Sequence, residues 1–163
     1  MAFESLLQIV GDVPGLRVLE ATSHADELSQ LLAEHVTSCG GQLHISAYPG
    51  VHAPVATSES VRYAEVGHYK APFKATARDF EVIILRDLLH RHLYAEKLLK
   101  HAYQGLENSA LVIVIQSEGS ISRERVEEML SACEYRAVNT ISDLLPGCFV
   151  TVGKKLHMWG NGL

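Results

Sequence analysis

The sequence has few cysteines, and they follow no disulfide or metal-binding pattern. Cys39, Cys133 and Cys148 are odd in number, widely spaced and include no Cys-x-x-Cys pair. This arrangement fits neither a disulfide framework nor a zinc knuckle, so we expect reduced, half-buried thiols. The nine histidines are scattered, and nothing in their spacing forces three or four ligands to converge. We therefore expect no metal site.

The sequence also lacks a basic excess and a long apolar run. Its 14 Lys and Arg stand against 19 Asp and Glu, which gives a formal net charge of −5 and no general attraction for nucleic acid. No stretch approaches the ~20 apolar residues that a membrane span needs, and residues 1–10 do not resemble a secretion signal. We expect a cytoplasmic protein that binds neither nucleic acid nor membrane.

What is present is the composition of one folded domain. The chain has 163 residues, of which 47% are hydrophobic and 20% charged, enough for a single packed core. Residues 1–14 carry apolar side chains at helical spacing and end at a Pro-Gly pair, which predicts an opening helix. Residues 15–163 are expected to form the α/β core of the same domain.

Strand patterns recur through this core. Short strands are predicted at residues 16–21, 43–47 and 61–66. Two continuous apolar runs, at 80–85 and 111–115, are typical of strands buried on both faces of a parallel sheet.

Helical patterns separate most of these strands. Ser23, with Asp26 three residues later, predicts a helix start directly after the first strand. Further helices are predicted at about 92–106 and after Ser122, whereas the proline-containing segment 49–74 predicts loops with one strand. The sheet is therefore expected to be reduced between its second and fourth strands.

The last two predicted strands, 135–141 and 149–156, set the fold class. About seven residues separate them, whereas a parallel crossover needs about a dozen or more, so one of the two must run antiparallel. The chain is thus predicted to form a three-layer α/β fold, with a mostly parallel sheet that ends in a C-terminal antiparallel β-hairpin.

Several motifs in the second half resemble those of the class I S-adenosylmethionine-dependent methyltransferases. Ala71-Pro72-Phe73 resembles the family's Leu-Pro-Phe, and Asp79-Phe80-Glu81-Val82 resembles its Phe-Asp-x-Val strand. Arg86-Asp87-Leu88-Leu89-His90 resembles the Asp-x-Leu-His that often ends the fourth strand. Their order and spacing agree with the family over about residues 60–156. The resemblance implies a Rossmann-like methyltransferase fold and S-adenosylmethionine as the cofactor.

The residues that would hold this cofactor depart from the family pattern. After the first strand the family places an acidic residue and a loop of about three glycines, because only glycine lets the backbone approach the cofactor closely. Here Glu20 is followed by Ala21-Thr22-Ser23-His24, without a glycine. Tyr48 stands near the place of the ribose-binding acid, and Gly67-His68 near that of an adenine-binding Asp. The resemblance places the cofactor at Glu20, Ala21, Thr22, Tyr48, Gly67 and His68.

Asp87, His90 and His92 follow the predicted fourth strand and are the candidate catalytic residues. Ligands of open α/β sheets bind beyond the carboxyl ends of the strands. A carboxylate beside an imidazole can orient a methyl acceptor and take its proton. Alternatively, Asp87 caps the following helix and the two histidines lie on a solvated loop.

Two functions remain open at this point. One is a divergent S-adenosylmethionine-dependent methyltransferase of unidentified acceptor, a small molecule, because methyl transfer depends mainly on geometry. The other is a non-catalytic methyltransferase-like scaffold that acts as a binding or oligomerisation module, with a protein or a second copy as partner. In that scaffold a side chain of Thr22, Ser23 or His24 would occupy the place of the cofactor's methionine part. Trp159 is either a partner contact or a residue packed over the sheet edge.

Overall fold

The computed structural model describes residues 2–74 and 79–156, so Trp159 lies outside the described residues. Helices separate some of the strands along these residues, whereas other strands follow one another directly. The strands are β1 (Arg17–Thr22), β2 (Gln42–Ala47), β3 (Val61–Glu65), β4 (Phe80–Arg86), β5 (Leu106–Ser117), β6 (Arg136–Ile141) and β7 (Cys148–Lys154). The helices are α1 (Ala2–Val10), α2 (Glu27–Ser38), α3 (Ala95–Gly105) and α4 (Arg123–Ala132).

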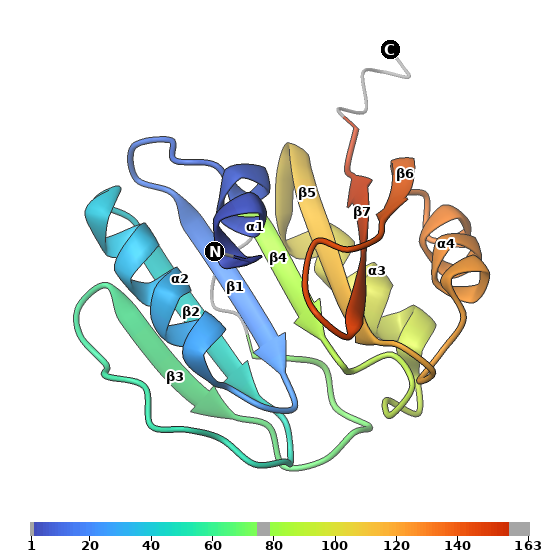
Figure 1. Cartoon of the computed structure of the whole chain (residues 1–163), viewed down its shortest axis with the longest axis horizontal. Coiled ribbons are helices and arrows are strands. Elements are labelled where there is room, and N and C mark those ends of the chain that lie inside the picture. Colours follow the sequence, from blue (N-terminus) through green and yellow to red (C-terminus); the bar gives the residue numbers. More distant parts are fainter. Residues whose placement is uncertain (1, 75–78, 157–163) are drawn as a thin grey trace.

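The strands form one sheet in the order β3-β2-β1-β4-β5-β7-β6 (Figure 1). The first five strands in this order run parallel to one another, whereas β7 is antiparallel to both β5 and β6. The short connection between β6 and β7 thus joins two antiparallel strands, as its length predicted. The C-terminal antiparallel hairpin is confirmed.

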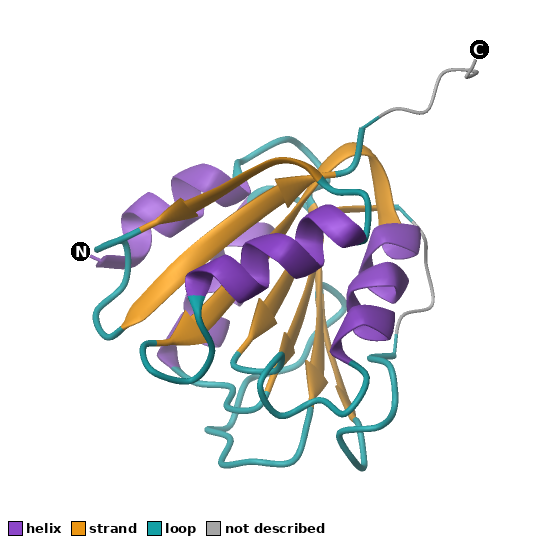
Figure 2. Cartoon of the chain, turned by 90° about the vertical axis from the view of Figure 1, so that its right-hand side faces the viewer, coloured by secondary structure: helices purple, strands orange, loops and turns teal. Residues whose placement is uncertain are grey.

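The helices cover both faces of the sheet (Figures 1 and 2). Leu28, Leu32 and Val36 of α2 pack with α1 over one face, in a core that includes Val18 and Ile84 of the sheet. The side chains of α3 and α4 form a second core over the opposite face. The predicted three-layer architecture is therefore confirmed. Within the described part of the chain, no helix is long and apolar enough to cross a membrane.

The start of α2 differs from the prediction. Asp26, not Ser23, is the N-cap: its side chain accepts a hydrogen bond from the Leu28 N–H, and the Ser29 hydroxyl accepts one from the Asp26 N–H. Ser23 is buried and donates its hydroxyl hydrogen bond to the carbonyl of Asp87, 3.3 Å away. A contact distant in sequence thus removes Ser23 from the cap, and the turn between β1 and α2 is longer than predicted.

The β3 side of the sheet is reduced, as predicted. Among the described residues, no helix lies between β2 and β4. His44 of β2 is 8% exposed and packs edge-on against the ring of Phe80, with 5.2 Å between the ring centroids. Burial lowers the pKa of His44, and the charges of Arg62 and Arg17 lower it further, while Asp79 partly opposes them. The folded chain therefore favours the neutral form of the His44 imidazole.

This lowered pKa predicts a loss of stability in mild acid. The unfolded chain takes up the His44 proton near pH 6.5, above the folded-state pKa, so the free energy of unfolding should fall as the pH drops below about 6.5. Urea unfolding at a series of pH values should show this slope. His44→Gln should reduce it, whereas His68→Gln, at an exposed position, should not. An unchanged slope in His44→Gln would contradict the assignment.

Candidate functional site

The carboxyl ends of β1 and β4 lie side by side and form the topological switch point of the sheet. Thr22 is in register with Arg86, and the chain leaves β1 and β4 toward helices on opposite faces. Open α/β sheets bind their ligands at such a point. If the chain has a cofactor site, it is therefore expected at the end of β4 and at the turn formed by residues 23–26.

Arg86 joins this turn to both strands. Its Nη1 donates hydrogen bonds to Glu20 Oε2 at 2.9 Å and to Asp26 Oδ1 at 3.0 Å, and its Nη2 donates to Asp26 Oδ2 at 3.0 Å. The pairing with Asp26 is bidentate, the strong form of this contact. The side chain of Arg86 is 7% exposed and that of Glu20 is fully buried. We call Arg86, Glu20 and Asp26 the Arg86 cluster.

The charges of the Arg86 cluster support one another. Burial alone would raise the pKa of Asp26, but the hydrogen bond and the charge of Arg86 outweigh it, so the pKa is lowered. Burial would likewise lower the pKa of Arg86, but Glu20 and Asp26 together raise it. Both shifts favour the ionised forms of Asp26 and Arg86. Glu20, which the resemblance places beside the cofactor, is thus paired with Arg86 in this chain.

Asp87 ties the end of β4 to β5. Its Oδ1 accepts from the Ser117 N–H at 2.7 Å and its Oδ2 from the Ser117 hydroxyl at 2.9 Å. His24 Nε2 lies 3.6 Å from the same Oδ2, and 3.4 Å from Arg86 Nη2. Asp87 adopts a φ of 52°, in the left-handed region that Asp tolerates better than most residues. Its carboxylate therefore holds two strand ends together.

The segment after β2 closes the turn from the other side. The Tyr48 N–H donates to the Thr22 carbonyl at 2.9 Å. His52 accepts from the Ala25 N–H at Nδ1, at 2.8 Å, and donates from Nε2 to the Tyr48 carbonyl, at 2.7 Å. At Gly50 an added Cβ would overlap the carbonyl oxygen of Ser23, so only glycine fits there.

Tyr48 and His92 both hold the loop that follows β3. The fully buried Tyr48 donates its hydroxyl hydrogen bond to the carbonyl of Ala71 at 2.7 Å. His92 Nε2 donates to the same carbonyl at 2.9 Å, while its Nδ1 accepts from the Tyr94 N–H at 2.9 Å. Both ring nitrogens of His92 are thus engaged. The helix predicted from about 92 begins only at Ala95, because this contact keeps the preceding residues in a turn.

Within the described residues, the three candidate catalytic residues form no hydrogen bond with one another. His90 is exposed, and its Nδ1 accepts from the side chain of Gln116 at 2.9 Å, next in sequence to Ser117, the partner of Asp87, whereas His92 contacts Ala71. Burial and the neighbouring Arg91 lower the pKa of His90, against the effect of Asp87. The structure instead brings His24 to Asp87.

The remaining predicted cofactor residues are divided between the sheet and an exposed loop. Ala21 and Thr22 are buried in β1, and the Thr22 hydroxyl accepts from the His24 N–H at 3.0 Å. Gly67 and His68 are exposed after β3, where His68 Nδ1 accepts from the Lys70 N–H. Within the described residues, neither Gly67 nor His68 forms a hydrogen bond with the Arg86 cluster.

Sequence reasoning missed Arg86 and Asp26 as site residues. A signal was present, because an arginine at the end of a continuous apolar strand needs a buried partner. Its partners lie 60 and 66 residues away, so the sequence did not name them.

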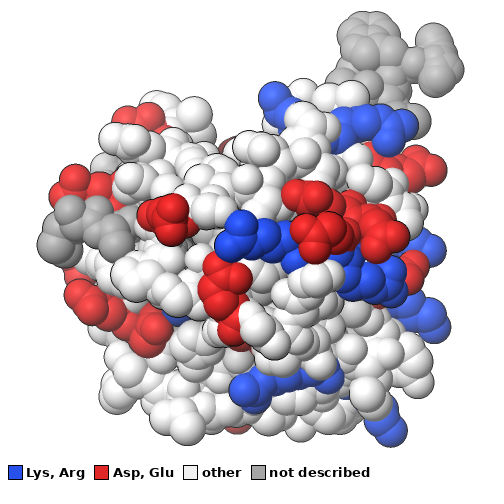
Figure 3. Space-filling model, turned by 45° about the vertical axis from the view of Figure 1, so that its right-hand side comes forward, with Lys and Arg blue, Asp and Glu red and all other residues white. Residues whose placement is uncertain are grey.

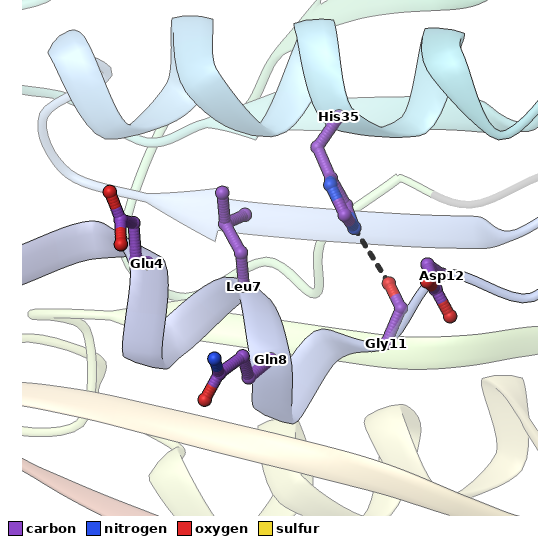
Figure 4. A pocket seen from close by; sticks show the side chains of 6 residues that line it. All are labelled: Glu4, Leu7, Gln8, Gly11, Asp12 and His35. Atoms are coloured by element: carbon purple, nitrogen blue, oxygen red, sulfur yellow. Dashed lines mark hydrogen bonds between the residues drawn. The ribbon is translucent and has the colours of Figure 1, made fainter.

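A pocket of about 470 Å³ lies elsewhere, between α1 and α2 (Figure 4). Leu7 and Glu4 come from α1 and His35 from α2, and His35 Nε2 donates to the Gly11 carbonyl at 2.6 Å. Because Gly11 precedes β1 and His35 lies in the last turn of α2, this pocket is near the amino ends of the strands. Nowhere in residues 2–74 and 79–156 do three His, Cys, Asp or Glu gather as potential metal ligands.

Removing Arg86 should strongly destabilise the fold. Arg86→Met leaves Glu20 buried without its cation, which costs about 3–5 kcal/mol in the free energy of unfolding. The double variant Arg86→Met/Glu20→Met should recover much of this loss, because both charges are then removed. Arg123→Met, which breaks the exposed pair with Glu118, should cost about 1 kcal/mol or less. Equal losses from the two single variants, measured by urea unfolding, would contradict a special role for Arg86.

Comparisons with known proteins find this fold but no sequence relative. No family model matches the chain, and no curated protein matches it in sequence. A SAM-dependent methyltransferase from Aquifex aeolicus matches in structure with a TM-score of 0.72 and 14% identity, over 94% of this chain and 89% of that chain. A TehB-like SAM-dependent methyltransferase from Corynebacterium glutamicum matches with a TM-score of 0.69 and 11% identity, over 94% and 87% of the two chains.

A longer methyltransferase also matches. Phosphoethanolamine N-methyltransferase 2 from Haemonchus contortus, solved with S-adenosyl-L-methionine, has a TM-score of 0.70 and 14% identity. The match covers 94% of this chain but 52% of that one. At such identities the likeness concerns the fold alone, and it agrees with the strand order and the antiparallel ending described above. The chain therefore has the class I methyltransferase fold that its sequence motifs resemble.

Proposed function

We propose that this protein is a methyltransferase-like scaffold that does not bind S-adenosylmethionine at the β1–α2 turn and acts as a binding module. The observation that carries the proposal is the Arg86 cluster, in which the buried guanidinium holds Glu20 and Asp26 at the switch point. A cofactor that used Glu20 Oε2 would have to displace this guanidinium first, and Glu20 Oε1 is buried from solvent.

The backbone around the cluster supports the same conclusion. A glycine loop leaves room for a cofactor because it presents bare backbone. Here the turn carries the buried side chain of Ser23, whose hydroxyl donates to the Asp87 carbonyl at 3.3 Å. The backbone at Gly50 lies close to the Ser23 carbonyl, where an added Cβ would overlap it. Opening this turn for a ligand would break contacts to two neighbouring segments, a cost that would be subtracted from the binding free energy.

The competing function is a divergent methyltransferase with a non-standard pocket. Its support is the fold, which these solved methyltransferases share, and fold alone does not carry an activity. The competing function requires that the cofactor binds. The two functions are therefore separated by a binding measurement.

We expect neither S-adenosylmethionine nor S-adenosylhomocysteine to bind. At about 1 mM ligand, a site with a Kd of about 10 µM would stabilise the folded protein by about 2.7 kcal/mol and raise its melting temperature measurably. We expect no such rise and no saturable heat in calorimetry. A methyltransferase that binds both compounds, titrated from the same stocks, controls for ligand quality.

Saturable binding of either compound would contradict the proposal. Glu128→Gln, at an exposed position of α4 outside the predicted cofactor residues, and Glu20→Gln would then distinguish the predicted crevice from a remote site. Loss of binding in Glu20→Gln alone would make the divergent methyltransferase the better description.

A further inference from the structure

The lysines of this acidic chain are unevenly distributed. Residues 1–69 contain none, and all six lie between residues 70 and 155. Lys97 and Lys100 belong to α3, Lys70 lines a pocket beside it, and Lys155 Nζ lies 5.0 Å from the ring centroid of Tyr103 in the same helix. In Figure 3 the basic side chains of the visible face gather mainly on its right half, while its left edge is mostly acidic.

A pocket of about 350 Å³ opens within this lysine-rich region. Lys70 and Pro72 come from the loop after β3, Tyr94 from the loop after β4, and Lys97 and Leu98 from α3. Both loops leave the carboxyl ends of their strands, the edge at which open α/β sheets present their ligands. The pocket is thus at the usual edge of the fold, but over the α3 face and apart from the Arg86 cluster.

The two lysines of this pocket are not paired with an acidic side chain of the described residues. Within residues 2–74 and 79–156, no carboxylate forms an ion pair with Lys70 or Lys97. Glu96, the acid next to Lys97 in α3, lies 3.7 Å from Arg125 of α4. Two unneutralised ammonium groups at one pocket favour a ligand group with more than one negative charge.

The rest of the lining is flat and apolar. Lys97 Nζ lies 5.1 Å from the ring centroid of Tyr94, which fixes the ammonium at the aromatic wall. Tyr94 is 49% exposed and offers an accessible ring, whereas Leu98 is 1% exposed and lies beneath the surface of the pocket. His92 and His101 also line the pocket; both nitrogens of His92 are engaged in hydrogen bonds, and His101 Nε2 donates to the Phe73 carbonyl at 3.1 Å.

We propose that this pocket is a binding site for a phosphate monoester carried on a flat apolar group, such as an aryl phosphate. Lys70 and Lys97 bind the phosphate, because lysine is a flexible point charge suited to its oxygens. Tyr94 and Pro72 contact the flat group. This site does not depend on whether the β1–α2 turn binds a cofactor, so the two proposals can fail separately.

The test is a two-dimensional NMR titration of the whole chain with phenyl phosphate at low salt. We expect saturable shifts of the amides around residues 94–101, with a Kd of about 1 mM or tighter. Inorganic phosphate and phenol, each of which offers only part of the ligand, should bind at least about tenfold more weakly.

Lysine variants give the matched control. Lys70→Met and Lys97→Met should each weaken phenyl phosphate binding about five- to tenfold, because each removes one cation from the pocket. Lys100→Met, on the same helix but outside this pocket, should leave the Kd unchanged. All three lysines are exposed, so these variants should fold normally.

Three outcomes would overturn the proposal. The first is no saturable shift up to about 10 mM phenyl phosphate. The second is an equal loss of affinity in Lys100→Met, which would indicate general charge attraction. The third is equal affinity for inorganic phosphate, which would remove the flat group from the site.

Discussion

One buried guanidinium organises the carboxyl edge of this sheet. Arg86 extends from β4 across the end of β1 to the start of α2 and donates hydrogen bonds to Glu20 Oε2 and to both carboxylate oxygens of Asp26. Removing the charges of Arg86 and Glu20 from water is costly, and their attraction repays the cost only while the geometry is held. The neighbouring contacts hold it: Ser23 is tied to Asp87, Asp87 to Ser117, and the segment after β2 to the turn. The shape of this edge thus depends on the two ion pairs of Arg86.

The fold was predictable because its signals are local. The apolar runs at 80–85 and 111–115 became the central strands β4 and β5, and the short link before β7 forced an antiparallel ending. The start of α2 was not predictable in the same way, since Ser23 and Asp26 are both good caps. A carbonyl 64 residues away engaged Ser23 and left the cap to Asp26. The contacts of the candidate site residues were less predictable, because their partners are distant in sequence: Asp87 and His90 contact adjacent residues of β5, whereas His92 contacts the loop after β3.

The fold resembles that of solved methyltransferases, whereas the side chains at the β1–α2 turn differ from the glycine loop that the family places there. The match to solved methyltransferases extends over more than nine tenths of the chain, which reflects backbone geometry set by hydrophobic packing. A glycine loop contributes little to that packing, so this chain has the same layers and strand order without one. In this chain, side-chain contacts of Ser23 and Asp26 stabilise the turn instead. The same carboxyl edge still offers a concave surface beside α3, where the loops after β3 and β4 meet.

Gly50 has a consequence for how this chain can change over time. The turn after β1 contains no glycine, yet the segment after β2 cannot do without one, because the Ser23 carbonyl occupies the space of a side chain at Gly50. A glycine loop placed after β1 would still meet Arg86, and a substitution of Arg86 would leave two carboxylates without their cation. Each single change therefore gives a less stable protein, and a different turn requires several coordinated replacements. Substitutions should accumulate on the surface of this chain more readily than at this edge of the sheet.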